Sequence, residues 1–321
     1  MECPRERRGG PSVDRLIDRM IFAGPPIASA AMFVFKAAVV GAGTMGGEIA
    51  QVVASAGIPV VLKDVKQEFV DTGLEKARQV TEAQLGSLVK KEKITQENAD
   101  AQREEILGRI TGTTAYDGFG DVDFVIEAVP ERMEVKQSVF GELDEATPGH
   151  AILASNTSSL SITEMAEATL RPDKVCGFHF FYPASMMRLI EVIEGDDTSD
   201  ETLAVASNFA QALRKTAVRC GEVPGFVVNR ILTSAMSEVW RVTEDEELDI
   251  KDVDKAIQES GTVPMGPYYL TDLLGLDTVL HVAEHLHDSY GERFHVSKPM
   301  QELVEAGNLG QKTGKGFYEH G

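Results

Sequence analysis

The sequence has few cysteines and no apolar run long enough to span a membrane. Cys3, Cys176 and Cys220 are an odd number of thiols with wide spacing, which excludes a disulfide framework or a CxxC metal site and favours a reducing compartment. The most apolar early stretch, residues 21–35, contains two prolines and is shorter than a membrane span. We therefore expect a cytoplasmic protein with no membrane insertion and no metal site.

Basic residues are also scarce. The 321 residues include 31 Lys and Arg against 51 Asp and Glu, so the formal net charge is −20. Such a charge repels phosphate backbones, so we expect no nucleic-acid partner, and an anionic ligand would need a local group of cations. The hydrophobic fraction of 43% and charged fraction of 26% exclude a disordered or coiled-coil protein and, at this length, predict two domains.

The first 32 residues differ in pattern from the rest of the chain. Arginines are offset there by acidic residues, whereas organelle transit peptides are poor in acids. We interpret residues 1–32 as an N-terminal extension, either a linker remnant or the result of a start site placed too early.

From Phe33 onward, short β-branched runs alternate with helical patterns, which is typical of a doubly wound parallel sheet with helices on both faces. The polar stretch 67–110 predicts an antiparallel helical hairpin that projects from the sheet, with its turn near residues 90–95. We expect strands within residues 33–40, 58–65, 122–129, 150–156, 174–181 and 188–194.

The strand pattern ends near Cys220, and helical patterns take over. We expect helices over residues 224–241, 248–260 and 273–287, the first of them opened by a proline. We therefore place a domain boundary near Gly221. The prediction is an α/β domain over residues 33–221 and a smaller all-α C-terminal domain over residues 222–321.

A glycine-rich motif comes directly after the first predicted strand. Gly41, Gly43 and Gly46 form a G-x-G-x-x-G with Thr44 and Met45 between the last two glycines. The first glycine permits a tight turn, the second lets the backbone approach a pyrophosphate, and the third lets the next helix pack closely. Backbone N–H groups and the helix dipole then hold the anion, so the motif predicts a dinucleotide site.

Asp64 ends the next predicted strand, 23 positions after Gly41. A carboxylate at this place can accept hydrogen bonds from an adenosine ribose and would repel a 2′-phosphate. The two features together favour NAD over NADP. The alternative is a glycine-rich turn with an unrelated surface aspartate.

Polar residues within or after strands are the candidate site residues, because ligands of open α/β sheets collect beyond the carboxyl ends of the strands. His179 lies among phenylalanines, and Glu191 lies among aliphatic residues on the next predicted strand. An unpaired buried carboxylate is costly, so we expect the two to pair. Such a pair would fix the imidazole tautomer and stabilise its protonated form, as a general base requires; the alternative is a structural ion pair.

Further polar candidates lie at other strand ends. Glu127 and Glu131 come at the end of the third predicted strand, and Asn156 and Ser158 at the end of the fourth. Asn156 and Ser158 can cap the next helix, and a ligand contact is compatible with that role. Asn229, on a mainly apolar helical pattern, is either a buried structural hydrogen bonder or a substrate contact.

Motifs spread over residues 36–318 together resemble the L-3-hydroxyacyl-CoA dehydrogenases, and most of all the dehydrogenase part of multifunctional bacterial β-oxidation enzymes. In chain order they are GAGTMGGEIA, EAVPE, SNTSSL, GFHFFYP, MMRLIEV, PGFVVNRIL, GTVPMGPYYLTDLLGLD and GQKTGKGFY. The resemblance implies a Rossmann-type fold with NAD as cofactor. It also implies reversible oxidation of (3S)-3-hydroxyacyl-CoA to 3-ketoacyl-CoA in fatty-acid β-oxidation or short-chain acyl-CoA metabolism.

The resemblance implies roles for individual residues. His179 would be the general base and Glu191 its orienting partner, while Ser158 and Asn229 would bind the reacting oxygen of the substrate. The chain departs from the family at Tyr182, where Asn is common and contacts the nicotinamide end. The implied cofactor contacts, besides the glycine loop and Asp64, are Glu131, Lys136, Asn156 and Lys312.

Coenzyme A carries several negative charges, so a chain at −20 needs local cations to bind it. Lys90 and Lys91, at the predicted hairpin turn, are the best linear group of cations for the acyl-CoA substrate; the alternative is a solvated helix end. The helices of residues 222–321 contain more apolar residues than are needed to cover one cofactor domain. We therefore expect a homodimer through them. Two other functions remain open: a dehydrogenase of a free hydroxy acid or sugar acid, and a non-catalytic nucleotide-binding structural protein.

Overall fold

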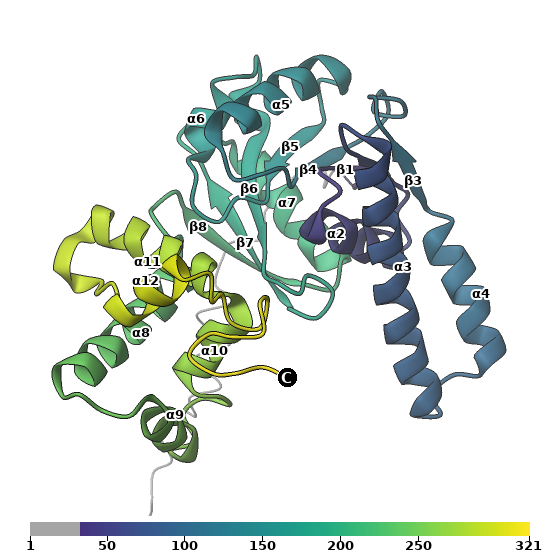
Figure 1. The fold of residues 1–321 in the computed structure, drawn as a ribbon. Helices are drawn as coiled ribbons and strands as arrows, with labels where there is room; N and C mark the ends of the chain where they lie inside the picture. The colour runs from purple at the N-terminus through teal and green to yellow at the C-terminus, as the bar shows by residue number, and fades with distance from the viewer. Residues whose placement is uncertain (1–32) are drawn as a thin grey trace, which may run out of the picture. The chain divides into compact units, whose positions relative to one another are not determined.

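The structure, a computed structural model, describes residues 33–321. The predicted N-terminal extension over residues 1–32 lies outside the described residues. Residues 33–221 fold around an eight-stranded sheet of order β3-β2-β1-β4-β5-β6-β7-β8 (Figure 1). The strands are β1 (Ala37–Val40), β2 (Val60–Lys63), β3 (Ile110–Thr113), β4 (Phe124–Glu127), β5 (Ile152–Ser155), β6 (Val175–Phe180), β7 (Leu189–Glu194) and β8 (Thr216–Gly221).

The strand order reverses between β1 and β4, which is the switch point where ligands bind in sheets of this kind. The helices around the sheet are α2 (Thr44–Ser55), α3 (Gln67–Lys90), α4 (Gln96–Leu107), α5 (Met133–Ala146), α6 (Ile162–Ala166) and α7 (Asp200–Ala212). After β8 come α8 (Val228–Asp245), α9 (Ile250–Glu259), α10 (Pro267–Leu274), α11 (Leu276–Tyr290) and α12 (Lys298–Glu305). These elements confirm the predicted α/β fold with a helical C-terminal part.

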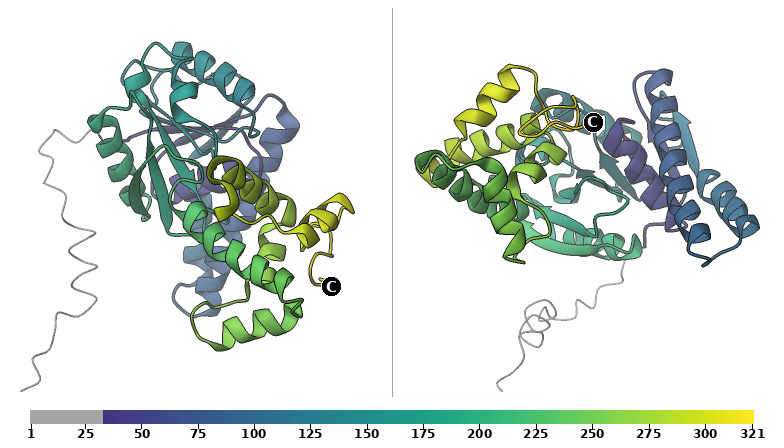
Figure 2. Two further views of the ribbon diagram at one scale, coloured as in Figure 1. Left: turned by 90° about the vertical axis from the view of Figure 1, so that its left-hand side faces the viewer. Right: turned by 60° about the horizontal axis from the view of Figure 1, so that its bottom comes forward.

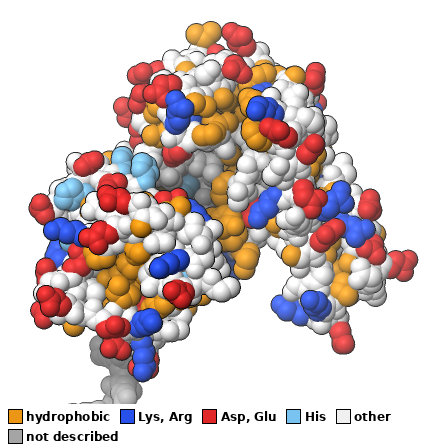
Figure 3. Space-filling view, in the orientation of Figure 1, with side chains coloured by type: hydrophobic (Ala, Val, Ile, Leu, Met, Phe, Trp, Pro, Cys, Tyr) orange, Lys and Arg blue, Asp and Glu red, His pale blue; other side chains and the backbone are white. Residues whose placement is uncertain are grey.

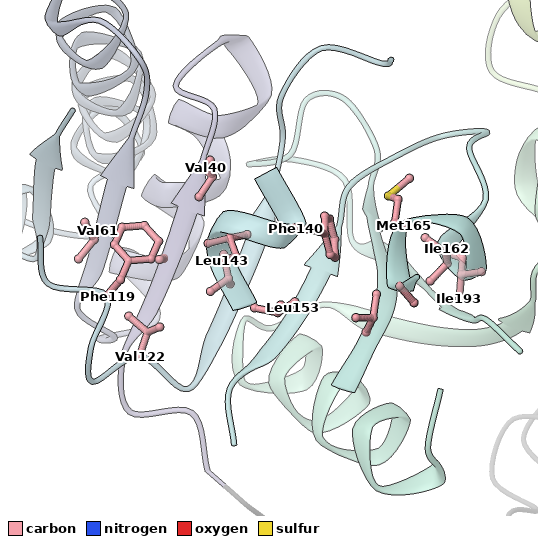
Figure 4. Close-up of a cluster of buried hydrophobic side chains, with 14 of the residues drawn as sticks. Val40, Val61, Phe119, Val122, Phe140, Leu143, Leu153, Ile162, Met165 and Ile193 are labelled. Carbon is pink, nitrogen blue, oxygen red and sulfur yellow. The ribbon is translucent and has the colours of Figure 1, made fainter. Parts of the chain in front are cut away.

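Helices cover both faces of the sheet because alternate strand residues point to opposite sides. On one face, Phe140 of α5 and Met165 of α6 pack in a cluster with Val40 and Leu153 of the strands (Figure 4). On the other face, the Phe209 ring of α7 lies 4.6 Å from the Phe124 ring, centroid to centroid. The strands are therefore buried on both sides, which explains their nearly continuous apolar sequences.

The predicted helical hairpin is confirmed. Helices α3 and α4 lie side by side in Figures 1 and 2, and the residues between them are 91–95. The Thr95 side chain caps α4 by accepting a hydrogen bond from the Asn98 N–H at 3.2 Å. Lys90 is the last residue of α3, so the predicted basic group lies at the free end of the hairpin.

The sheet departs from the predicted parallel arrangement at one place. Strands β6 and β7 are antiparallel, while all other neighbouring strands are parallel. The connection from Phe180 to Leu189 is shorter than the dozen or more residues that a parallel crossover needs. Strands β3 and β8 were not predicted, because both lie at sheet edges and their residues are only partly buried.

The C-terminal helices also differ from the prediction in detail. Helix α8 begins at Val228 rather than at Pro224, because Gly225 (φ 74°) and Phe226 (φ 45°) take left-handed backbone conformations. The predicted helix over 273–287 is two helices, divided at Gly275, whose φ is 95°. Helices α8, α10, α11 and α12 share a core that contains Trp240, Tyr268, Leu280, Ala283 and Met300. Within residues 33–321 no helix has the length and apolarity that a membrane span requires.

Candidate functional site

The glycine loop between β1 and α2 has the geometry of a pyrophosphate cradle. A Cβ on Gly41 would lie 2.5 Å from the Ala128 carbonyl oxygen, and a Cβ on Gly46 would lie 1.7 Å from the Gly41 carbonyl oxygen. Both positions therefore exclude any side chain. A Cβ on Gly43 would meet no atom within 4 Å, and Gly43 and Thr44 are exposed. The loop is thus tight on its inner side and open where a ligand would approach.

The first turn of α2 is suited to an anion. No side chain of the described residues caps it, and it contains no acidic residue, so its N–H groups and dipole can meet a phosphate. Asp64 stands next to the loop: its Oδ2 accepts a hydrogen bond from the Ala42 N–H at 2.7 Å and its Oδ1 from the Val65 N–H at 2.6 Å. Each oxygen keeps a lone pair for a ribose hydroxyl. The residues present therefore fit NAD.

His179 and Glu191 are direct neighbours across β6 and β7. The antiparallel register pairs the two residues, and His179 Nδ1 lies 2.8 Å from Glu191 Oε2. The Glu191 side chain is fully buried and His179 is 6% exposed. Glu191 Oε1 accepts hydrogen bonds from the backbone N–H groups of Val227 (3.0 Å) and Val228 (2.8 Å). The predicted pair is present, and the start of α8 completes it.

The charge state of Glu191 results from these contacts. Burial by itself would raise the pKa of Glu191, but the hydrogen bonds from His179, Val228 and Val227 outweigh it and lower the pKa. Glu191 is therefore an anion and can only accept hydrogen bonds, so Nδ1 of His179 carries the proton that it donates. The other ring nitrogen, Nε2, is then the basic atom of the neutral imidazole. The Phe181 ring lies 4.6 Å from the imidazole, centroid to centroid.

A second group of polar side chains lies at the ends of β4 and β5. Glu131 Oε1 accepts hydrogen bonds from Thr157 Oγ1 (2.6 Å) and from the Ser158 N–H (2.9 Å), and Ser158 Oγ lies 3.3 Å from it. Lys136 is 1% exposed and its Nζ lies 2.8 Å from Glu127 and 3.1 Å from Glu131. The N–H groups of Lys136 therefore contact residues of the protein itself. Any influence of Lys136 on a bound ligand would act through Glu131.

Asn156 and Ser158 do not cap the next helix, so the structure does not show the capping role that the sequence leaves open for them. Ser161 caps α6, because its side chain accepts a hydrogen bond from the Glu164 N–H at 3.0 Å. Asn156 Oδ1 instead accepts a hydrogen bond from the Phe180 N–H at 2.8 Å. Asn156 therefore ties the end of β5 to the residue next to His179.

The remaining predicted residues lie at several places. Asn229 is in the first turn of α8, directly after the two N–H groups that bind Glu191. Tyr182, next to Phe181, is half exposed. Lys312 Nζ donates hydrogen bonds to Asp277 Oδ1 at 2.7 Å and Thr278 Oγ1 at 3.1 Å, at the start of α11. No hydrogen bond between described residues joins Lys312 to the glycine loop or to His179.

Lys90 and Lys91 are exposed at the end of α3. Figure 3 shows Lys and Arg side chains gathered near that end of the hairpin, on a face where acidic side chains are widely spread. The structure therefore keeps these two lysines apart from the polar groups at the strand ends and leaves them open to an anionic ligand.

Sequence reasoning missed the backbone of Val227 and Val228 as part of the site. The signal that could have pointed to it is an absence: the residues before α8 are Pro, Gly, Phe and Val, none of which has a capping side chain. Across the described residues, no cluster of three or more His, Cys, Asp or Glu side chains could hold a metal ion.

Comparison with protein families gives two consecutive matches. Residues 36–223 match the family described as "3-hydroxyacyl-CoA dehydrogenase, NAD binding domain". Residues 225–320 match "3-hydroxyacyl-CoA dehydrogenase, C-terminal domain". The two matches meet close to the end of β8 at Gly221, near the place where the sequence predicts a domain boundary.

Individual relatives carry the same two parts. The chain is 42% identical over 286 residues to a probable 3-hydroxybutyryl-CoA dehydrogenase of Deinococcus radiodurans. The alignment covers 89% of this chain and all of that protein. It is 41% identical over 290 residues to a fatty acid oxidation complex subunit alpha of Psychrobacter, of which it spans 38%. The solved structure of (S)-3-hydroxybutyryl-CoA dehydrogenase from Ralstonia eutropha superposes with a TM-score of 0.82 at 37% identity, covering 90% of this chain and 99% of that one.

Proposed function

This chain belongs to the 3-hydroxyacyl-CoA dehydrogenase family, and we propose that His179 and Glu191 perform the proton transfer of its NAD-dependent reaction. The observation that carries the proposal is the 2.8 Å contact between His179 Nδ1 and the buried Glu191 carboxylate. It leaves Nε2 as the basic nitrogen in an apolar setting beside Phe181. The substrate is a (3S)-3-hydroxyacyl-CoA, and the product is the 3-ketoacyl-CoA.

The site residues have separate roles in this reaction. Nε2 of His179 takes the proton of the 3-hydroxyl group as the C3–H bond breaks, so that positive charge develops on the imidazole and no free alkoxide forms. Glu191 stabilises that charge and holds the ring through Nδ1. Ser158 and Asn229 donate to the reacting oxygen. When bound, NAD supplies the nicotinamide that accepts the hydride from C3.

The cofactor side uses the glycine loop and Asp64. The open face at Gly43 and the uncapped start of α2 hold the pyrophosphate, and Asp64 accepts hydrogen bonds from the ribose. Glu131, held by Thr157 and Ser158, contacts the nicotinamide half with Lys136 fixing its position. Asn156 contributes to the site by accepting a hydrogen bond from the Phe180 N–H. Lys312 can contact the cofactor only if its hydrogen bond to Asp277 breaks.

The variant His179→Gln tests the central role. Gln keeps a polar side chain but cannot take a proton, so turnover of acetoacetyl-CoA with NADH falls by about 10²–10⁴-fold, as is typical for loss of a general base. NADH binding, measured by fluorescence titration, stays near the parent value because the glycine loop is untouched. Parental turnover in this variant would remove His179 from the mechanism.

The anionic end of coenzyme A binds at Lys90 and Lys91, which are exposed at the end of the hairpin. The double charge reversal Lys90→Glu with Lys91→Glu raises KM for acetoacetyl-CoA and leaves kcat unchanged, because the lysines lie apart from the reacting groups. An unchanged KM would show that these lysines do not bind coenzyme A and are an ordinary solvated helix end.

Free hydroxy acids are the alternative substrates of such a fold. Comparing rates with acetoacetyl-CoA and with free 3-keto acids distinguishes the two, and the family membership favours the thioester. A series of 3-ketoacyl-CoA substrates of increasing length then gives the chain-length preference. The division of the chain near Gly221 and a cytoplasmic location are part of the same proposal.

A homodimer through the C-terminal helices completes the proposal. Ile231 and Val242 of α8 are 65% and 45% exposed. They are eleven residues apart, which is about three helical turns, so both lie on one side of the helix. Exposed apolar residues repeated along one side are typical of a surface that another chain covers.

A further inference from the structure

Phe226 occupies an unusual position between the two parts of the chain. Its φ of 45° puts a bulky residue in the left-handed region, which costs free energy for any residue with a Cβ. Its side chain is 1% exposed and belongs to the core cluster of the sheet domain, with Val175, Ile193 and Ile162. The ring is therefore anchored in the sheet domain, although the residue immediately precedes the C-terminal helices.

The residues after Phe226 serve Glu191 directly. Val227 and Val228 donate their N–H groups to Glu191 Oε1, and no side chain next to α8 in sequence caps this helix. Glu191 is thus the cap of α8, supplied from β7. Since Oε2 of the same carboxylate meets His179, one carboxylate joins the start of α8 to the imidazole.

The Phe226 ring also stands close to the imidazole itself. The two ring centroids are 5.9 Å apart. A shift of Phe226 would therefore move both neighbours of the pair: the N–H donors that hold Glu191 and the apolar surface next to His179.

We propose that Phe226 is a positioning residue, whose buried ring and left-handed backbone fix the start of α8 against Glu191 and thereby the orientation of His179. The inference rests on the proposed roles of His179 and Glu191. It gives the start of the C-terminal helices a part in the chemistry, because the backbone there supplies the donors that hold the orienting carboxylate.

The variant Phe226→Ala tests this by removing the ring. Without it the start of α8 is free to shift, Glu191 loses aligned donors, and kcat falls by about 10- to 100-fold, the scale of a misplaced catalytic group. KM for acetoacetyl-CoA and NADH affinity stay within about twofold of the parent. Phe226→Leu keeps an apolar anchor and recovers kcat to within about threefold. Phe119→Ala, a fully buried phenylalanine of the same core cluster, is the matched control and keeps parental kcat.

The background Glu191→Gln separates positioning from a general loss of structure. If Phe226 acts through Glu191, then adding Phe226→Ala to Glu191→Gln lowers kcat by less than about twofold more. If the fold-losses of kcat from the two substitutions multiply in the double variant, the inference is overturned and the proposed function remains intact. Parental turnover in Glu191→Gln alone would instead overturn the role of Glu191. Should Phe226→Ala fail to fold, Phe226→Gly replaces it in the same cycle, because glycine also removes the ring and adopts the left-handed φ without strain.

Discussion

At the scale of single residues, the molecule buries acids because each has a specific partner. Glu127 and Glu191 are fully buried in a chain of net charge −20, and both are surrounded by donors. Breaking a buried pair by removing one partner leaves an uncompensated charge and is strongly destabilising. The partners of these acids therefore contribute to stability as well as to the proposed chemistry.

Glu131, a partly exposed acid beside the buried Lys136, contributes a pH dependence to the stability of the fold. Burial by itself would raise its pKa, but the charge of Lys136 and the hydrogen bonds from Thr157 and Ser158 outweigh burial and lower it below the ordinary 4.5. The native protein therefore binds this proton less readily than the unfolded chain. Glu131 thus stabilises the fold above about pH 4.5, and this contribution is lost as the pH falls through the lowered pKa.

The variant Glu131→Gln lacks this contribution. Because the Glu131 side chain is 32% exposed, we expect the free energy of unfolding to be lower than that of the parent by no more than about 1 kcal/mol at neutral pH. The difference shrinks as the pH falls below 4.5. Urea denaturation at several pH values measures it. Glu145→Gln, at an exposed acid of the same α5 region, is the control, with a change below about 0.5 kcal/mol. A difference that stays constant into the acid range would contradict the account.

At the scale of elements, the close packing of α2 and α3 depends on two glycines. A Cβ on Gly47 would lie 2.6 Å from the Gly73 carbonyl oxygen, and a Cβ on Gly73 would lie 2.7 Å from the carbonyl oxygen of Ala42. Ala42 is part of the glycine loop. The long helix α3 of the hairpin therefore packs directly against the backbone of the glycine loop.

Gly73→Ala would push α3 away from the loop. We expect the free energy of unfolding to fall by about 1–3 kcal/mol from overpacking and NADH to bind more weakly. Urea denaturation and a fluorescence titration measure the two effects. Gly86→Ala, on the same helix with no atom within 4 Å of the added Cβ, is the matched control, and it leaves stability equal or about 0.5–1 kcal/mol higher. Equal behaviour of the two variants would refute this view of the packing.

Elements also show what the sequence could and could not predict. The strand, glycine loop, helix and Asp64 come one after another along the chain, so spacing alone predicts them. The pairing of His179 with Glu191 was predictable because each needed a partner among apolar residues. The short connection after Phe180 also indicates the antiparallel direction of β7, since a parallel crossover needs a dozen or more residues. The contacts of Glu191 with the start of α8 depend on tertiary structure that no local pattern records.

At the scale of the whole molecule, the C-terminal helices leave apolar side chains exposed, and we expect a second copy of the chain to cover them. We predict that sedimentation velocity at micromolar concentration will show a dimer. Ile231→Glu places a charge on the exposed side of α8 and shifts the equilibrium toward the monomer, because an unpaired charge is costly to bury. A stable monomer in the parent chain would exclude the homodimer.

The proposed mechanism depends on one arrangement, in which the Glu191 anion accepts a hydrogen bond from Nδ1–H of His179 and leaves Nε2 as the basic nitrogen. The ¹⁵N chemical shifts of the histidine rings test it most directly, with His179 assigned by its loss in His179→Gln. We expect the neutral ring of His179 to carry its proton on Nδ1. A neutral ring protonated on Nε2 would contradict the proposed mechanism, because the basic nitrogen would then be Nδ1, which faces Glu191, and Nε2 could not accept the substrate proton.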